Sequence, residues 1–356
     1  MSTRPLNVKD LVELQPAHAL WQIYQPENAP YRFGATTRTQ AELWQTETRQ
    51  ALSNTLGFQD WTVVDPEPQT IESVDKGDYV REKILMRTSP YTVMPVYLLL
   101  PKSTTQPLPA VLALHGHGYG VKDIVGLWED GDERDTPDGY HKDFAVALCR
   151  QGFAVAAPEI SCFGERQTDF SYLDGPISGT APSTCDHTAK LAFHLGGSAL
   201  GLRVWDAKRL VDYLGTRPEF DVERLGAMGI SGGGMHTFFS ACLDERIRAC
   251  VVSGYYCTFR DSILAMSHCT CNFCPGLGQF GEMYDLVGLI APRPILVESG
   301  SKDPIFPIAS TKDSVERARQ VYDVFGASSQ VETDFFEGRH QISGRRAYNF
   351  LREKLS

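Results

Sequence analysis

The stretch Gly229-Ile230-Ser231-Gly232-Gly233 decides how this 356-residue sequence is interpreted. It follows an apolar segment typical of a buried strand and precedes a small-residue helix start. Glycines around Ser231 permit a sharp, strained turn that would lift the serine hydroxyl above the carboxyl edge of a sheet. The backbone N–H of Gly232 would then face an oxyanion. The pattern predicts a nucleophilic serine, and a tight strand-to-helix junction without chemistry is the competing interpretation.

A serine nucleophile needs a histidine that removes its proton and a carboxylate that orients this histidine. Asp303 and His340 follow Ser231 in this order, each just beyond a predicted strand. His340 is the only histidine after position 268, so the base has one candidate. Glu298 is a competing acid. We favour Asp303 because a turn beyond the end of a strand can reach across to the histidine.

A second oxyanion donor is expected in the glycine-rich loop that follows an earlier strand, residues 110–114. We assign this role to the backbone N–H of His117, with Gly118 as the alternative. The side chains of His115 and His117 resemble a pair of metal ligands, but no acidic or histidine partner lies at a suitable spacing. We therefore expect both rings to pack within the loop and assign no metal ligand.

Strand-like and helix-like segments alternate from residue 110 onward, which predicts an α/β fold with a mostly parallel central sheet flanked by helices. Residues 1–60 are expected to form a helical extension, with helices over 8–24 and 39–56. Residues 61–356 are expected to form the main domain, with two long insertions at about 161–200 and 254–290. Antiparallel strands are expected at its start, at residues 61–64, 79–86 and 91–100.

The composition is that of an ordinary globular protein, with about 42% apolar residues and 34 basic against 44 acidic side chains. The net charge of −10 argues against binding to nucleic acid or to an anionic membrane, because both require a basic surface. The start of the chain lacks the pattern of a secretory signal, so we expect a cytoplasmic protein.

The nine cysteines are scattered and odd in number, which indicates free thiols and not a disulfide framework. The segment 268–274 contains His268 and three cysteines, a possible zinc or redox cluster. Structural zinc sites usually combine two separated pairs of ligands, and the sequence shows no second cysteine pair. Buried or pocket-lining thiols are therefore the favoured interpretation.

Two charged pairs lie near the predicted site. Glu159 and Arg166 follow a predicted strand and are candidates for contact with a substrate, although an ion pair that orders the first insertion is the simpler expectation. Asp206 and Arg209 stand three residues apart on a predicted helix, which favours an ion pair between them.

Several motifs together resemble the dienelactone-hydrolase and acetyl-xylan-esterase-like branch of the α/β-hydrolases, over about residues 80–356. These motifs occupy residues 115–118, 205–206, 209–214, 229–234, 291–295, 301–307 and 338–340. The resemblance implies the α/β-hydrolase fold and a carboxylic ester hydrolase that works through an acyl-enzyme, with acetylated sugars as one substrate option. Dienelactone hydrolases proper use a cysteine nucleophile, so Ser231 favours the esterase side.

A serine ester hydrolase is therefore the leading hypothesis, with a small-molecule ester as substrate and no metal or organic cofactor. A serine peptidase with the same order of catalytic residues is a weaker alternative. The third hypothesis is a catalytically silent binding protein that uses the insertions. The sequence does not specify the oligomeric state.

Overall fold

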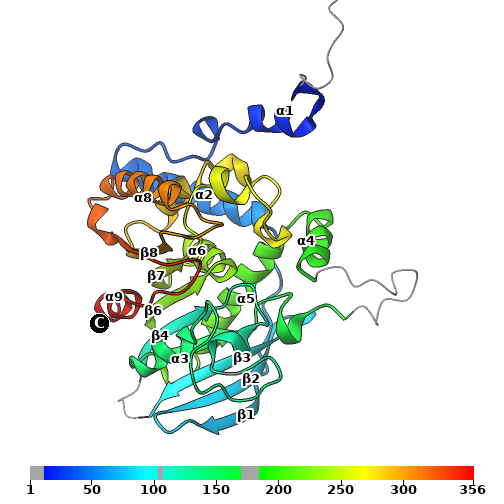
Figure 1. The fold of residues 1–356 in the computed structure, drawn as a ribbon, viewed down its shortest axis with the longest axis vertical. Coiled ribbons are helices and arrows are strands. Elements are labelled where there is room, and N and C mark those ends of the chain that lie inside the picture. The colour runs from blue at the N-terminus through cyan, green and yellow to red at the C-terminus, as the bar shows by residue number, and fades with distance from the viewer. Residues whose placement is uncertain (1–11, 103–106, 170–183) are drawn as a thin grey trace, which may run out of the picture.

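A nine-stranded sheet organises residues 12–102, 107–169 and 184–356, which this computed structural model describes (Figure 1). Its strand order is β1-β2-β3-β5-β4-β6-β7-β8-β9. The strands are β1 (Gln69–Asp75), β2 (Tyr79–Ser89), β3 (Thr92–Pro101), β4 (Leu108–Leu114), β5 (Ala154–Pro158), β6 (Phe220–Ile230), β7 (Ile247–Ser253), β8 (Ile295–Gly300) and β9 (Val331–Phe336). Strands β1 to β3 pair antiparallel, β3 is antiparallel to β5, and the remaining pairs are parallel. The predicted α/β class with a mostly parallel sheet is confirmed.

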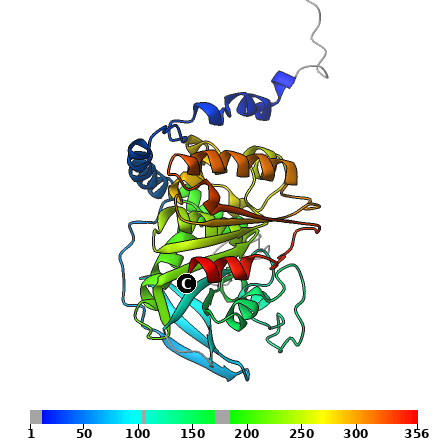
Figure 2. The same ribbon diagram turned by 90° about the vertical axis from the view of Figure 1, so that its left-hand side faces the viewer.

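Helices cover both faces of the sheet because residues along the central strands alternate between two cores. In β4, Leu112 belongs to one core and Val111 to the other. The first core includes residues of α5 (Ala199–Leu214), α6 (Gly232–Leu243) and α8 (Ile308–Asp323). The second includes residues of α3 (Phe144–Arg150) and α9 (Ala347–Lys354), and Figure 2 shows α9, in red, against the sheet.

The N-terminal region contains two helices that differ in their packing. Helix α2 (Arg38–Leu56) buries Leu52 and Leu56 in the first core. Helix α1 (Pro16–Ile23) buries no residue and lies at the periphery of the molecule in both views, where the guanidinium of Arg260 lies over the ring of Trp21 (Figures 1 and 2). The predicted helix over 8–24 begins later than expected, because Pro16 starts α1 after a separate 3-10 turn (Val12–Leu14). Residues 8–11 lie outside the described residues.

The predicted strand at residues 61–64 is wrong. Its aromatic residue, Trp61, packs on Phe58 and on Trp205 of α5, with ring centroids 5.2 and 6.3 Å apart, and residues 61–64 join no strand. The first strand of the sheet is β1, seen after two prolines, Pro66 and Pro68. Its side chains are almost all exposed, and this is why it lacked an apolar signal.

The two segments expected as insertions contain mostly short elements. The first holds a 3-10 turn (Gly164–Arg166) and helix α4 (Thr184–His194), and part of it lies outside the described residues. The second holds a π-helical turn (Phe259–Ile263), 3-10 turns at Thr270–Asn272, Leu277–Phe280 and Val287–Leu289, and helix α7 (Met283–Leu286). In the described parts of the chain, no helix combines the length and apolarity needed to cross a bilayer.

Candidate active site

Ser231 occupies the turn between β6 and α6 with φ 58° and ψ −122°, a conformation that side chains with a Cβ atom rarely adopt. The neighbouring glycines allow the close contacts of this turn. A Cβ atom at Gly233 would lie 1.9 Å from the carbonyl oxygen of Leu114, and one at Gly229 would lie 2.3 Å from the carbonyl oxygen of Gly233. Packing therefore requires glycine at positions 229 and 233.

His340 and Asp303 lie side by side near this turn. The His340 Nδ1 atom is 2.7 Å from Oδ2 of Asp303, whose side chain is fully buried. The other carboxylate oxygen of Asp303 accepts hydrogen bonds from the backbone N–H groups of Ile305 and Phe306, at 3.0 and 3.1 Å. The Nε2 atom of His340 is buried and has no hydrogen-bond partner among the described residues. The imidazole is thus held at one nitrogen and available at the other.

Glu298, the competing acid, has a different environment. Its carboxylate accepts hydrogen bonds from the Ser253 hydroxyl at 2.8 Å and from the backbone N–H groups of Ser343 and Gly344 at 2.9 Å each. Burial raises the pKa of Glu298 above its ordinary value. Of the two acids considered, Asp303 is the one that contacts His340.

Tyr140 is a site residue that no sequence motif indicated. Its hydroxyl donates to the carbonyl oxygen of His117 at 2.5 Å and also contacts the side chain of Ser231. Its ring lies 5.4 Å from that of His340, on which the ring of Phe306 also stacks, at 5.7 Å. Tyr140 therefore connects the serine turn, the histidine and the loop of the expected oxyanion donor.

The loop after β4 is positioned by a buried pair. The backbone N–H of Gly116 donates to Nε2 of His141 at 2.8 Å, so Nδ1 of this ring carries the proton and donates to Asp123 at 2.9 Å. Burial lowers the pKa of His141, which favours this neutral ring. The arrangement fixes the path of the backbone just before His117.

The candidate site opens into a pocket of about 270 Å³. It is lined by residues from the loop after β4, the serine turn, the second insertion and the turns after β8 and β9: His117, Tyr140, Ser231, Ser267, His268, Cys269, Asn272, Ile305, Phe306 and His340. Of the predicted site residues, Ser231, His340 and His117 share this pocket directly. Gly232 follows Ser231 as the first residue of α6.

Glu159 and Arg166 are not among the residues that line this pocket. Glu159 is 1% exposed and accepts from the backbone N–H of Val121 at 2.9 Å, with the Nε2 atom of His115 at 3.1 Å. The simpler expectation, an ion pair between Glu159 and Arg166, is wrong: the guanidinium of Arg166 pairs with Asp206 at 2.7 Å and touches Glu159 only through its backbone carbonyl.

The expected ion pair between Asp206 and Arg209 is also wrong. Arg209 pairs with Asp212 at 2.8 Å, one turn further along α5, and stacks over the ring of Trp205 at 4.6 Å. Arg166 reaches Asp206 from the first insertion, a tertiary contact that local helix spacing does not reveal.

The cysteine-rich segment has partners that are distant in sequence. The structure brings His117 and Cys185 to Cys269 and Cys271, and the four ligand atoms of these side chains lie within 4.8 Å of one another. His115 does not join them, since its ring lies against Glu159 and its Nδ1 atom donates to the backbone carbonyl oxygen of Gly116 at 2.8 Å. These four side chains could hold a metal ion.

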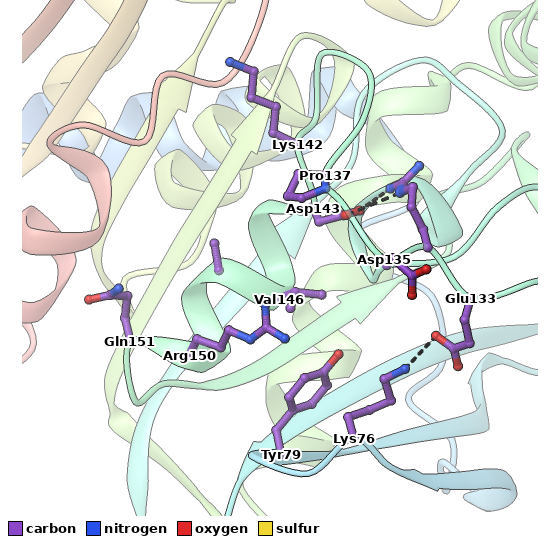
Figure 3. Close-up of a pocket in the computed structure, with 13 residues that line it drawn as sticks. Lys76, Tyr79, Glu133, Asp135, Pro137, Lys142, Asp143, Val146, Arg150 and Gln151 are labelled. Atoms are coloured by element: carbon purple, nitrogen blue, oxygen red, sulfur yellow. Dashed lines mark hydrogen bonds and ion pairs between the residues drawn. The ribbon is translucent and has the colours of Figure 1, made fainter.

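A larger pocket, of about 470 Å³, lies elsewhere and contains none of the predicted site residues (Figure 3). Its charged side chains are largely paired with one another: Lys76 contacts Glu133 at 2.8 Å, and Arg134 forms a buried ion pair with Asp143. It has no serine, cysteine or histidine among its lining residues, so the pocket that contains Ser231 and His340 remains the candidate site.

Comparisons with known proteins show the family and the fold of this chain. A family model described as the abhydrolase family matches residues 18–341. A Bacillus subtilis (strain 168) protein assigned as hydrolase YtaP is 27% identical over 259 residues, which cover 70% of this chain and 78% of that protein.

Solved structures show a similar fold. One from Bacteroides fragilis, assigned as an acetyl xylan esterase, has a TM-score of 0.74 and 20% identity, covering 94% of this chain and 84% of that one. A glucuronoyl esterase from Solibacter usitatus has a TM-score of 0.65 and 15% identity, covering 93% of this chain and all of that one. At these identities the similarity is one of fold.

Proposed function

The chain belongs to the abhydrolase family, and from this we propose that it hydrolyses carboxylic esters through an acyl-enzyme formed on Ser231. The proposal assigns Asp303 and His340 as the other members of a catalytic triad. It also assigns the backbone N–H groups of Gly232 and His117 as the oxyanion hole.

One observation carries this proposal. His340 is hydrogen bonded to the buried Asp303 through Nδ1, while its buried Nε2 has no partner among the described residues and its ring lines the same pocket as Ser231. A histidine held in this way has the tautomer and the free nitrogen that a general base requires.

In the first half of the reaction, Ser231 attacks the ester carbonyl while His340 accepts the hydroxyl proton at Nε2. The carboxylate of Asp303 stabilises the imidazolium that forms. The two backbone N–H groups bind the negative charge on the former carbonyl oxygen. His340 then protonates the departing alcohol, which leaves an acyl group on Ser231.

In the second half, a water molecule loses a proton to His340 and attacks the acyl carbonyl. The same oxyanion donors stabilise the second tetrahedral intermediate, and its collapse releases the carboxylic acid and restores Ser231. Every step uses groups of this chain and water alone.

For the substrate, we propose an ester with a small acyl group on a sugar. The modest pocket volume and the bulky rings of Phe306 and Tyr140, which line the same pocket as Ser231 and pack near His340, support a short acyl chain such as acetyl. The fold similarity to a protein assigned as an acetyl xylan esterase is in line with this choice. We also propose that the segments at about 161–200 and 254–290 act as insertions that set the acyl size, since residues of the second line the pocket.

The decisive experiment is intact-mass analysis after incubation with a fluorophosphonate. We expect one adduct on the wild type and on Ser267→Ala, which removes another serine hydroxyl from the same pocket, and none on Ser231→Ala. Unlabelled wild-type protein would then be screened on acetyl esters of sugars and on peptide amides. No adduct on folded wild-type protein would overturn the proposal in favour of a silent binding protein, and selective amide cleavage would favour a peptidase.

A further inference from the structure

One wall of the active-site pocket contains a cluster of potential metal ligands, formed by His117, Cys185, Cys269 and Cys271. The Sγ atom of Cys271 lies 3.3 Å from that of Cys269 and 3.5 Å from Nε2 of His117. All four ligand atoms lie within 4.8 Å of one another. Three sulfur atoms and one imidazole nitrogen therefore converge on a single point.

Three separate segments supply these side chains. His117 comes from the loop after β4, Cys185 from the first turn of α4, and the other two cysteines from the 3-10 turn region of the second insertion. A hydrogen bond from the Thr270 hydroxyl to Asp186, at 2.7 Å, holds the second and third segments together. The second ligand pair that the sequence lacked is thus present, but its members are 68 residues apart.

The distances match a mononuclear tetrahedral site. With metal–sulfur and metal–nitrogen bonds of about 2.3 and 2.0 Å, the ligand atoms of a zinc tetrahedron are separated by about 3.5–3.8 Å. The two short separations here and the upper bound of 4.8 Å lie around these values. A ligand set of three cysteines and one histidine is among those that zinc uses in structural sites.

A buried positive charge beside the cluster is also consistent with a zinc–thiolate site. Arg203 is 1% exposed, and its guanidinium contacts the carbonyl oxygen of Ser161 at 3.2 Å and the Sγ atom of Cys185 at 3.8 Å. Within the described ranges no carboxylate forms an ion pair with it, although a buried arginine normally needs one. A zinc ion with three thiolates and a neutral imidazole carries one net negative charge, which the guanidinium would balance.

We propose that Cys185, Cys269, Cys271 and His117 bind one structural zinc ion beside the active site. Four protein ligands close the coordination sphere, so this ion takes no part in ester hydrolysis. Its role is to fasten α4 and the second insertion to the loop after β4. The Nδ1 side of the His117 ring faces the serine turn, where a Cβ atom at Gly232 would lie 3.0 Å from it. The ion therefore holds the loop that carries the backbone N–H of His117.

The first test is the zinc content of the full chain, purified under reducing conditions without chelator. We expect close to one zinc ion per chain for the wild type and a loss of most of it in Cys185→Ala and Cys271→Ala. The matched control is Cys149→Ala, which removes a buried free thiol from the opposite core and should keep the metal.

A second test needs no variant. Exchange of the bound ion for Co²⁺ should produce thiolate-to-metal charge-transfer absorption and the intense visible bands of tetrahedral cobalt. Removal of the metal with a strong chelator should lower the Tm of the wild type, and added Zn²⁺ should restore it. The same treatment should leave the Tm of Cys271→Ala unchanged, provided that this variant folds.

The proposal does not depend on ester hydrolysis and can fail independently of it. It is overturned if folded, reduced wild-type protein neither contains nor takes up zinc while all nine thiols titrate. It is equally overturned if the mass of the native protein shows a disulfide among Cys185, Cys269 and Cys271, since a disulfide removes two of the ligands.

Discussion

A Cβ atom at Gly254 would lie 3.0 Å from Cε1 of His340 and 3.1 Å from its Nδ1 atom. Gly254 directly follows β7 and has φ 49°. The imidazole of His340 therefore packs directly against the backbone at the end of this strand. The position of His340, the proposed base, thus depends on the lack of a side chain at Gly254 as well as on its hydrogen bond to Asp303.

Replacement of this glycine should therefore damage catalysis. We expect Gly254→Ala to push the imidazole out of line and lower kcat by about 10- to 100-fold. Gly326→Ala is the matched control, because Gly326 also has a positive φ, 69°, but no atom lies within 4 Å of the added methyl group. Both variants should lose a similar free energy of unfolding, about 1 kcal/mol. Equal kcat values for the two variants would contradict the expected contact.

The two acids near the site should respond differently to loss of charge. We expect Asp303→Asn to lower kcat by about three to four orders of magnitude near neutral pH, because the asparagine no longer orients and stabilises the imidazolium. Glu298→Gln should lower the free energy of unfolding and leave kcat of the folded protein within a few-fold of the wild type. Steady-state kinetics and urea unfolding of both variants provide the comparison, and the reverse ranking would assign the role to Glu298.

Tyr140 should contribute through its hydroxyl group. Tyr140→Phe removes the hydrogen bond to the carbonyl of His117 and the contact with Ser231, so we expect kcat to fall roughly three- to tenfold with little change in KM. Tyr213→Phe removes a hydroxyl that accepts from Arg217 away from the pocket and serves as control. An unchanged kcat would show that the loop keeps its position without this bond.

A buried carboxyl group should make stability depend on pH. Burial raises the pKa of Asp285 to about 6, above the ordinary value of 3.8, while backbone N–H groups of Phe33 and Glu282 bind its oxygens. The folded state holds this proton more tightly than the unfolded state. The protonated carboxyl group of Asp285 therefore adds to the free energy of unfolding in full below about pH 4, and this stabilisation is lost as pH rises through 6. The free energy of unfolding of the wild type should therefore decline as pH rises, and Asp285→Asn should remove up to about 3 kcal/mol of this decline.

Urea unfolding at pH 4.5 and 6.5 checks this expectation. The exposed Asp323→Asn on α8 is the control and should follow the wild type at both pH values. If Asp285→Asn shows the same difference in unfolding free energy between the two pH values as the wild type, the carboxyl group does not titrate as described.

The sequence predicted those features that depend on local patterns. Apolar runs and glycines marked most strands of the sheet and the turn at Ser231, and the ends of successive parallel strands brought Asp303 and His340 to one edge. The wrongly predicted strand at residues 61–64 shows the limit of this approach. A loop segment whose aromatic residue packs on the ring of Trp205 in α5 has the same aromatic and β-branched composition as a strand.

Contacts between distant segments could not be predicted in this way. Tyr140 reaches the site from a loop without a motif, and Arg166 pairs with Asp206 across 40 residues. Cys185 and His117 meet the two cysteines of the second insertion only because α4 and the loop after β4 fold against it. No spacing rule connects such residues, since the fold alone determines their neighbours.

The backbone angles of Ser231, φ 58° and ψ −122°, imply that this residue lowers the stability of the fold while it supplies the hydroxyl proposed for catalysis. Glycine adopts these angles without the steric penalty that a Cβ atom incurs. The variant Ser231→Gly should then be inactive yet harder to unfold than the wild type. Selection for folding alone would favour glycine at this turn, so the serine found there is retained against a stability trade-off.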